Sequence, residues 1–336
     1  MDTQIVLDHG SGGLASQELI GSLFLKHLTD PHLHQLEDAA VLDNQTGRLA
    51  FSTDSYVVDP LFFPGGNIGE LAVNGTINDL AMRGANSLCL SLGLIIEEGL
   101  AMDTLEEIVK SIARACDYAG VPVVTGDTKV VPRGKADKIF INTSGIGVIK
   151  DGIEVTATQA GKGDVIILSG TLADHGITIL TSREGLQVDG NLQSDTRPLH
   201  FLVQNILEQA PQAVHTMRDP TRGGLGTTLG EIAKTTGLCM EIEEKALPIQ
   251  REVRAACELM GLDPLYLANE GKCVVFAAPE KAELILETMR ATPEGRKSAI
   301  IGRVTDVHPG RVVLTTTSGG ARLVEPLTGE PLPRIC

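Results

Sequence analysis

Five aspartates in short polar segments are the residues with the clearest potential for chemistry. They are Asp38 in EDAAVL, Asp54 in FSTDSYV, Asp79 in GTINDLAMRGA, Asp127 in VTGDTKV and Asp219 in RDPTRGG. Asp54 and Asp127 stand at or near the ends of apolar strand-like runs, and Asp79 lies in an apolar helical pattern with Asn74 and Asn78. Because desolvating a lone carboxylate is costly, such groups either pair with Arg or Lys or ligate a cation. Mg²⁺ is a suitable cation, since it prefers a few carboxylates with phosphate oxygens and water.

Each aspartate taken singly has an ordinary explanation, because Asp is common in turns and helix caps. Five of them in segments rich in Gly, Thr and Asn weaken that explanation. The chain has no GxxxxGK[ST] sequence, so a P-loop is excluded as the phosphate cradle.

The C-terminal segment 325–336, EPLTGEPLPRIC, contains three prolines and ends in Cys336. It has too few apolar residues to pack as a helix. A Pro-rich segment extends ~3.1 Å per residue, so this one reaches roughly 35 Å. We expect a flexible arm with an exposed thiol at its end. The α-carboxylate of Cys336 disfavours the thiolate and Arg334 favours it, which leaves the reactivity of the thiol open.

Three further features could take part in chemistry. Glu270 lies in ANEGK and Lys129 in GDTKV. The alternative interpretation of Glu270 is a surface acid of a helix or turn, and that of Lys129 is a solvated charge. The segment HGSGG at 9–13 could bind an anion through its backbone N–H groups and His9, or it could be an ordinary loop.

Strand and helix patterns alternate along most of the chain. The expected strands cover 48–58, 87–96, 121–125, 138–149, 165–169, 238–243, 272–277, 297–305 and 311–316. The expected helices cover 68–83, 103–119, with Asp103 as N-cap, 173–184, 197–209, 224–236, 249–260 and 279–291. This alternation predicts two α/β (or α+β) domains. We place them at 38–150 and 151–322, after a Gly-rich lead-in at 1–37 and before a tail at 323–336.

Composition narrows the class of protein. The 336 residues carry a net charge of −15, which disfavours nucleic-acid binding but not a nucleotide held through Mg²⁺. We expect no membrane span, since no stretch approaches about 18 apolar residues. The six cysteines form no CxxC pair, and the N-terminus has no basic signal region. These features favour the reducing cytoplasm.

Six motifs occur in an order that resembles the PurM-like ATP-dependent superfamily. They are EDAAVL, STDSYV, NGTINDLAMRGA, GDTKVV, RDPTRGGL and NEGK. Within that superfamily, HGSGG, the run STDSYVVDPLFFPGGNIG and the terminal PRIC are most similar to the HypE family of hydrogenase maturation factors. The resemblance implies a PurM-like fold: an N-terminal ATP-binding and dimerisation domain, a C-terminal α/β domain and a flexible tail.

The resemblance also implies ligands and site residues. It implies a homodimer that binds ATP and Mg²⁺. The implied metal ligands are Asp38, Asp54, Asp79, Asp127 and Asp219. The implied nucleotide-binding residues are Asp54, Asn74, Asp79, Asp127, Lys129 and Asp219.

The implied activity is that of a carbamoyl dehydratase. The carbamoyltransferase HypF would place a carboxamide on Cys336, and ATP-dependent dehydration would convert it to a thiocyanate. The cyano group would pass to the HypC–HypD complex, which builds the iron–cyanide unit of [NiFe]-hydrogenase. A positioned carboxylate can accept the amide protons, so Glu270 is the expected base. Lys129 would neutralise phosphate charge or assist proton transfer.

Two other functions fit the same motifs. The first is a small-molecule kinase or synthetase, like thiamine-monophosphate kinase or selenophosphate synthetase. Selenophosphate synthetases carry Cys or selenocysteine in the N-terminal Gly-rich loop, whereas the first cysteine here is Cys89. The second is a non-catalytic nucleotide-binding scaffold, which predicts no chemical change at Cys336.

Overall fold

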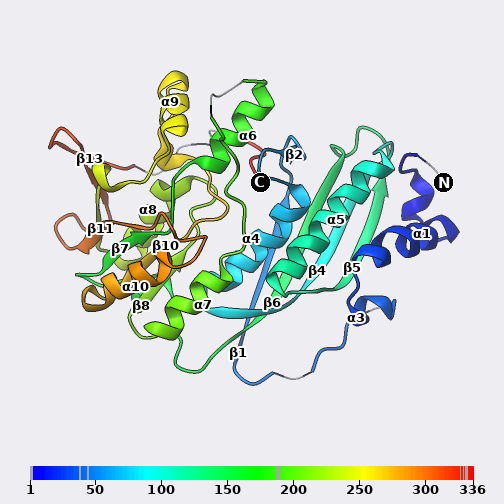
Figure 1. Cartoon of the computed structure of the whole chain (residues 1–336), viewed down its shortest axis with the longest axis horizontal. Helices are drawn as coiled ribbons and strands as arrows, with labels where there is room; N and C mark the ends of the chain where they lie inside the picture. The colour runs from blue at the N-terminus through cyan, green and yellow to red at the C-terminus, as the bar shows by residue number, and fades with distance from the viewer. Residues whose placement is uncertain are drawn as a thin grey trace.

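The computed structural model describes residues 3–37, 39–43, 45–186, 190–325, 327, 329 and 332–336. Two mixed sheets form its frame (Figure 1). The first has the strand order β1-β6-β4-β5, and the second has the order β13-β12-β9-β11-β7-β10-β8. Helices accompany both sheets, which confirms the predicted α/β (α+β) class.

The first sheet carries two long helices on one face (Figure 1). Its strands are β1 (Arg48–Tyr56), β4 (Ala85–Glu97), β5 (Val123–Val131) and β6 (Ile139–Ile149). The helices are α4 (Ile68–Met82) and α5 (Met102–Ala119). Nearly every residue of α4 is buried, because this helix packs on the sheet and also contacts α7 and β8 of the second half.

Local sequence explains the ends of these helices. Asn67 caps α4, since its side chain accepts hydrogen bonds from the N–H groups of Gly69 and Glu70. Gly84, with φ +72°, follows the helix. The prediction that Asp103 caps α5 is wrong: Ala101 precedes the helix, and Asp103 lies in its first turn. There a carboxylate still interacts favourably with the helix dipole.

The N-terminal residues form short helical pieces beside the edge strand β5 (Figure 1). They are η1 (Leu7–Gly10), α1 (Leu14–Leu19), the π-helical η2 (Ile20–Phe24), α2 (Leu25–His27) and α3 (Pro31–His34). A two-stranded hairpin of β2 (Phe62–Phe63) and β3 (Gly66–Asn67) precedes α4.

The second sheet has short, largely buried strands. They are β7 (Val165–Leu168), β8 (Val214–Arg218), β9 (Cys239–Glu243), β10 (Val274–Ala277), β11 (Ala299–Thr305), β12 (Val312–Thr315) and β13 (Ala321–Leu323). The helices are α6 (Asp174–Glu184), α7 (His200–Gln209), α8 (Gly224–Thr236), α9 (Arg251–Met260) and α10 (Ala282–Arg290). Strands β8 and β13 were not expected from the sequence. Among the described residues, no helix combines the length and apolarity needed to cross a membrane.

The C-terminus lies in the middle of the molecule, between the two halves (Figure 1). Leu332 and Ile335 are buried in the main apolar core. The tail therefore ends where the loops of both halves meet, and the candidate active site lies at that junction.

Candidate active site

Three of the five predicted aspartates gather where the two halves meet. Asp54 lies near the end of β1, Asp79 near the end of α4, and Asp219 directly after β8. The Ser52 hydroxyl donates a 2.7 Å hydrogen bond to Oδ2 of Asp79. The three lie close enough for their charges to interact, since the charges of Asp79 and Asp54 both raise the pKa of Asp219.

Burial makes the carboxyl groups of Asp79 and Asp219 hold their protons more tightly. Burial, followed by the charge of Asp79, raises the pKa of Asp219 to about 7. Burial also raises the pKa of Asp79, although the hydrogen bond from Ser52 opposes that shift. Within the described part of the chain, no three His, Cys, Asp or Glu side chains are placed to hold a metal ion. The aspartates of one chain thus form a carboxylate cluster, not a complete protein-only metal site.

Glu270 lies next to this cluster, and its side chain is buried. Its backbone is fixed from both sides: its N–H donates to Oδ1 of Asp195 at 3.2 Å, and its C=O accepts from Nδ2 of Asn78 at 3.0 Å. Its Oε1 atom has no hydrogen-bond partner among the described residues. Burial and the charges of Asp195 and Asp219 raise the pKa of Glu270 well above its usual range. A buried carboxyl group with a raised pKa and an unused oxygen is suited to proton transfer.

Arg222 is the cation of this site, and it was not among the predicted residues. Its Nη2 lies 3.9 Å from Oδ1 of Asp54. The negative charge at Cys336, and then those of Asp54 and Glu270, raise the pKa of Arg222. The guanidinium group therefore faces both the acids and the end of the tail. The motif RDPTRGGL contains Arg222, so this motif was the sequence feature from which the residue could have been identified.

The tail is docked, and Cys336 is half-buried. Its C=O accepts a 2.9 Å hydrogen bond from the N–H of Val57, and the C=O of Arg334 accepts one of 3.3 Å from the N–H of Asp59. Nε of Arg334 donates to the C=O of Val57 at 2.9 Å. The expectation of an exposed thiol on a free arm is therefore wrong for residues 332–336, because they pair with the segment after β1.

Arg183 on α6 holds the tail through its main chain. Nη1 donates to the C=O of Pro333 at 2.9 Å, and Nη2 donates to the C=O of Arg334 at 2.8 Å. Nε and Nη2 also donate to the C=O of Asp59, at 3.0 and 2.8 Å. One guanidinium group thus joins the tail to the segment that it pairs with.

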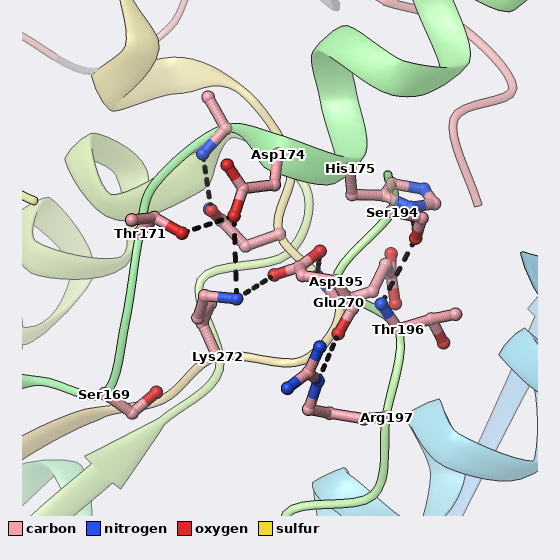
Figure 2. A network of polar contacts seen from close by, with 12 residues as sticks. Ser169, Thr171, Asp174, His175, Ser194, Asp195, Thr196, Arg197, Glu270 and Lys272 are labelled. Carbon is pink, nitrogen blue, oxygen red and sulfur yellow. Dashed lines mark hydrogen bonds and ion pairs between the residues drawn. The ribbon is translucent and has the colours of Figure 1, made fainter. Parts of the chain in front are cut away.

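His175, on the same helix, holds the next residue of the tail. Its Nε2 lies 2.7 Å from the C=O of Ile335, which can only accept a hydrogen bond, so Nε2 donates. Its Nδ1 lies 2.7 Å from Oγ of Ser194. Both residues are labelled in Figure 2. Because Nε2 carries the proton of the neutral ring, Nδ1 accepts, and the Ser194 hydroxyl donates to it while its Oγ accepts from the N–H of Thr196. Burial lowers the pKa of His175, which agrees with a neutral ring.

Two asparagines of α4 connect the helix to the segment that crosses between the halves. Asn74, a predicted nucleotide ligand, is buried and donates to Oγ1 of Thr196 at 3.3 Å. Its Oδ1 has no partner among the described residues. Asn78 accepts from the N–H of Leu199 at 2.7 Å and donates to the C=O groups of Arg197 and Glu270. Asn78 is therefore a positioning residue for Glu270.

Asp127 and Lys129 lie elsewhere in the chain. Strand β5 runs to Val131, so both residues are inside a strand, where they form an exposed 3.0 Å ion pair. The sheet register places Asp127 level with Ser55, on the face opposite to Asp54. Within one chain, the structure does not bring Asp127 and Lys129 together with the carboxylate cluster.

These two residues line a cavity of about 230 Å³ beside the N-terminal helices. Its walls include Gly10 and Gly12 of the Gly-rich segment, and several leucines. Gly10 is required by a close approach, because a Cβ there would lie 2.5 Å from the backbone N of Val130. Asp38, the fifth predicted aspartate, lies outside the described residues.

Comparison with known proteins first identifies the class of fold. Residues 36–149 match the family model described as "AIR synthase related protein, N-terminal domain", and residues 161–315 match the corresponding C-terminal domain. Together with the two sheets, these matches define a PurM-like fold, as predicted.

Three relatives narrow the class further. The curated "Carbamoyl dehydratase HypE" of Azotobacter vinelandii is 51% identical and is covered over 98% of this chain and 96% of its own. The crystal structure of a HypE in complex with ATP is 50% identical, with a TM-score of 0.95 over 98% of this chain and 99% of that chain. The crystal structure of a HypE–HypF complex is 45% identical, with a TM-score of 0.81 over 92% of this chain and 99% of that chain.

The chain belongs to the HypE family of carbamoyl dehydratases, which are enzymes of hydrogenase maturation. The family predicted from the motifs is confirmed, and with it the class of enzyme. The relatives that share half of the sequence are carbamoyl dehydratases, not the kinases or synthetases that share only some of the motifs.

Proposed function

We propose that this chain dehydrates a carboxamide carried on the Cys336 thiol to a thiocyanate, with ATP as co-substrate. The thiocyanate would supply cyanide ligands for the iron centre of [NiFe]-hydrogenase. One observation carries the proposal: the residue at the end of the docked tail faces Arg222, and the buried carboxyl group of Glu270 is within the same charge cluster.

The reaction needs an activated oxygen and a proton acceptor. Transfer of the γ-phosphoryl group of ATP to the amide oxygen turns a poor leaving group into phosphate. One N–H proton leaves as the C=N bond forms, and the second leaves as the C–O bond breaks, which yields S–C≡N, phosphate and ADP. We assign the acceptance of an N–H proton to Glu270 and the stabilisation of negative charge on oxygen to Arg222.

The nucleotide would bind in the cavity beside β5. A relative of this family was solved in complex with ATP. In this chain, Leu and Phe side chains of that cavity offer an apolar surface for a base, and Gly10, Gly12 and Lys129 offer N–H groups and a cation for phosphate. This arrangement supports the proposed roles of Asp127 and Lys129 in nucleotide binding.

Magnesium suits the carboxylate cluster. Asp54, Asp79 and Asp219 are oxygen donors, and mutual repulsion and burial raise the pKa values of Asp79 and Asp219. A divalent cation would remove that repulsion, and phosphate oxygens would complete its coordination. Bound there, Mg²⁺ would supply charge neutralisation for phosphoryl transfer. We propose these three residues as ligands in this chain.

Magnesium should stabilise the folded chain more at pH 8 than at pH 6. A pKa of about 7 means that Asp219 is mostly protonated at pH 6 and mostly ionised at pH 8, so protons compete with Mg²⁺ at the lower pH. The measurement is the thermal midpoint with and without Mg²⁺ at both pH values. The variant Asp219→Asn should lose most of the pH dependence of that shift. An equal shift at both pH values in the wild-type chain would contradict the prediction.

We propose a homodimer that pairs the exposed faces of two N-terminal sheets. Leu49, Phe51 and Ile95 are exposed apolar side chains on that face, and Phe51 is 70% exposed. Asp127 lies on the same face. Because the nucleotide cavity and the carboxylate cluster lie apart within one chain, the proposal requires the second copy to bring its Asp127 and its nucleotide to the cluster of the first chain. Large exposed apolar patches commonly mark protein interfaces.

The variant Phe51→Asp is expected to convert the dimer to a monomer, because it places a charge in the centre of the apolar face. Light scattering after size exclusion measures the mass. Leu259→Asp is the matched control, since Leu259 is 84% exposed on α9, away from that sheet. A dimer that survives Phe51→Asp but not Leu259→Asp would place the interface elsewhere.

The partners follow from the chemistry of the tail. We propose that HypF loads the carboxamide, in keeping with the solved complex of its relatives. HypC–HypD would accept the cyano group. We also propose a cytoplasmic location, because Cys89, Cys116, Cys239, Cys257 and Cys273 are buried thiols outside any disulfide.

The proposed function is tested by the mass of the C-terminal peptide. After incubation with the carbamoyltransferase, the peptide should gain one carboxamide, and it should lose one water only when Mg-ATP is added. Cys336→Ser should bind ATP but show neither change. A Cys336 that stays unmodified in a chain that binds ATP would reject the proposal.

A further inference from the structure

A second cavity, which is polar and has a volume of about 300 Å³, lies in the C-terminal half beside the network of polar contacts in Figure 2. Its lining includes Lys272 and Asp195 of that network, the amides of Gln193 and Gln250, and the loop after α10. The volume lies at the lower end of the range of about 300–1,000 Å³ for small-molecule sites. The site proposed above does not use this cavity.

Three cations at this cavity are available to a ligand. Arg296 and Lys297 are exposed and make no hydrogen bond or ion pair with other described residues. Arg197 uses only its Nε, which donates to the C=O of Asp195, so both of its Nη groups are unused among the described residues. The rim also carries one acid, Glu294, whose Oε1 accepts a hydrogen bond from the hydroxyl of Tyr118 at 3.5 Å. Its three cations outnumber that acid, so the net charge of the rim is positive and favours an anion.

The buried floor of the cavity holds one cation, which is paired with two acids. Nζ of Lys272 lies 2.9 Å from Oδ2 of Asp195 and 3.9 Å from Oδ2 of Asp174. The Thr171 hydroxyl donates to the same Oδ2 of Asp174. The floor is therefore polar and fixed, and an incoming anion would pair with the Arg and Lys of the rim.

The lining also limits the class of ligand. Apart from the ring of Pro293 and the backbone of Gly170, its residues are polar or charged. Nothing in this lining offers the apolar or aromatic surface on which a nucleotide base could stack, in contrast to the leucine-rich cavity beside β5. We propose that this cavity binds inorganic phosphate or the phosphate of a small polar ester, held by Arg197, Arg296 and Lys297.

The test uses the full-length chain saturated with a non-hydrolysable ATP analogue, so that the nucleotide cavity is filled. Inorganic phosphate is then titrated by calorimetry. The double variant R296Q and K297Q should weaken phosphate binding at least tenfold. The double variant R254Q and K281Q is the matched control: it removes the same charge from exposed residues outside the cavity and should change the affinity less than twofold.

Saturable binding that both double variants weaken equally would show general attraction by positive charge and would overturn the proposal. Binding that neither variant changes, or no saturable binding to the wild-type chain, would overturn it as well. Thermal unfolding of each variant confirms that the fold is intact, and all four substituted side chains are exposed.

Discussion

The variant Glu270→Gln is expected to lower the rate of ATP-dependent dehydration by about 10²–10⁴-fold, the usual effect of losing a general base. The amide of Gln fills the same volume but cannot accept the proton. Loading of the carboxamide should be unchanged, because Glu270 is buried and does not contribute to the surface. The measurement is the rate at which the loaded C-terminal peptide loses water, followed by mass spectrometry, with Glu283→Gln on α10 as control.

The pH dependence of stability separates a loss of catalysis in Glu270→Gln from unfolding of that variant. Because the pKa of Glu270 is raised, the folded chain keeps a proton that the unfolded chain releases above the ordinary pKa of Glu. The contribution of this group to stability is complete below that ordinary pKa and is lost as pH rises toward the folded value. Glu270→Gln should therefore unfold at the same or a higher temperature at pH 8. A variant that is stable and dehydrates at the wild-type rate would reject Glu270 as the base.

The variant Arg183→Ala is expected to slow dehydration by about 10–100-fold, because a thiocarboxamide that is no longer held in place loses the advantage of a fixed geometry. Four hydrogen bonds that join the tail to the segment after β1 would be lost. Single-turnover dehydration of the loaded chain measures the effect. His175→Phe, which keeps the ring but removes the bond to Ile335, should act in the same direction.

Alkylation provides a second readout for the tail. Once it is undocked, Cys336 should react faster with iodoacetamide, while the other five cysteines are buried and slow. Arg254→Ala is the control, since Arg254 is exposed on α9. If Arg183→Ala slows dehydration without faster alkylation, the residue acts on the chemistry and not on docking of the tail.

Much of the fold could be predicted from the sequence because long periodic segments set it. Helix α5 has a clear amphipathic pattern, and β6 alternates between buried and partly exposed residues along most of its length. The short strands β8 and β13 carry five and three residues, too few to show a period, and were missed. Asp103 was expected to cap α5 from its residue type alone, although the backbone begins the helix one residue earlier.

The candidate site could be predicted only in part. The motifs pointed to Asp54, Asp79 and Asp219, which do meet, because each follows or ends an element at the junction. They could not show that Asp127 faces the other side of the sheet, since that depends on one residue of strand register. Residues on α6 that hold the tail were missed because they bind main-chain carbonyls, which leave no side-chain pattern.

The hydrogen bonds that hold the tail have a consequence for the order of the reaction steps. Arg183, His175 and Val57 bind the carbonyl groups of residues 333–336, which belong to the main chain and not to the side chain that carries the reacting group. These main-chain hydrogen bonds are thus the same for a bare thiol, a thiocarboxamide and a thiocyanate. Uniform binding of this kind cannot drive a reaction forward. These contacts therefore do not distinguish a tail that carries the thiocyanate from one that carries the thiocarboxamide or a bare thiol. Departure of the finished group must then depend on the acceptor, which has to compete for the same carbonyls or capture the tail while it is undocked.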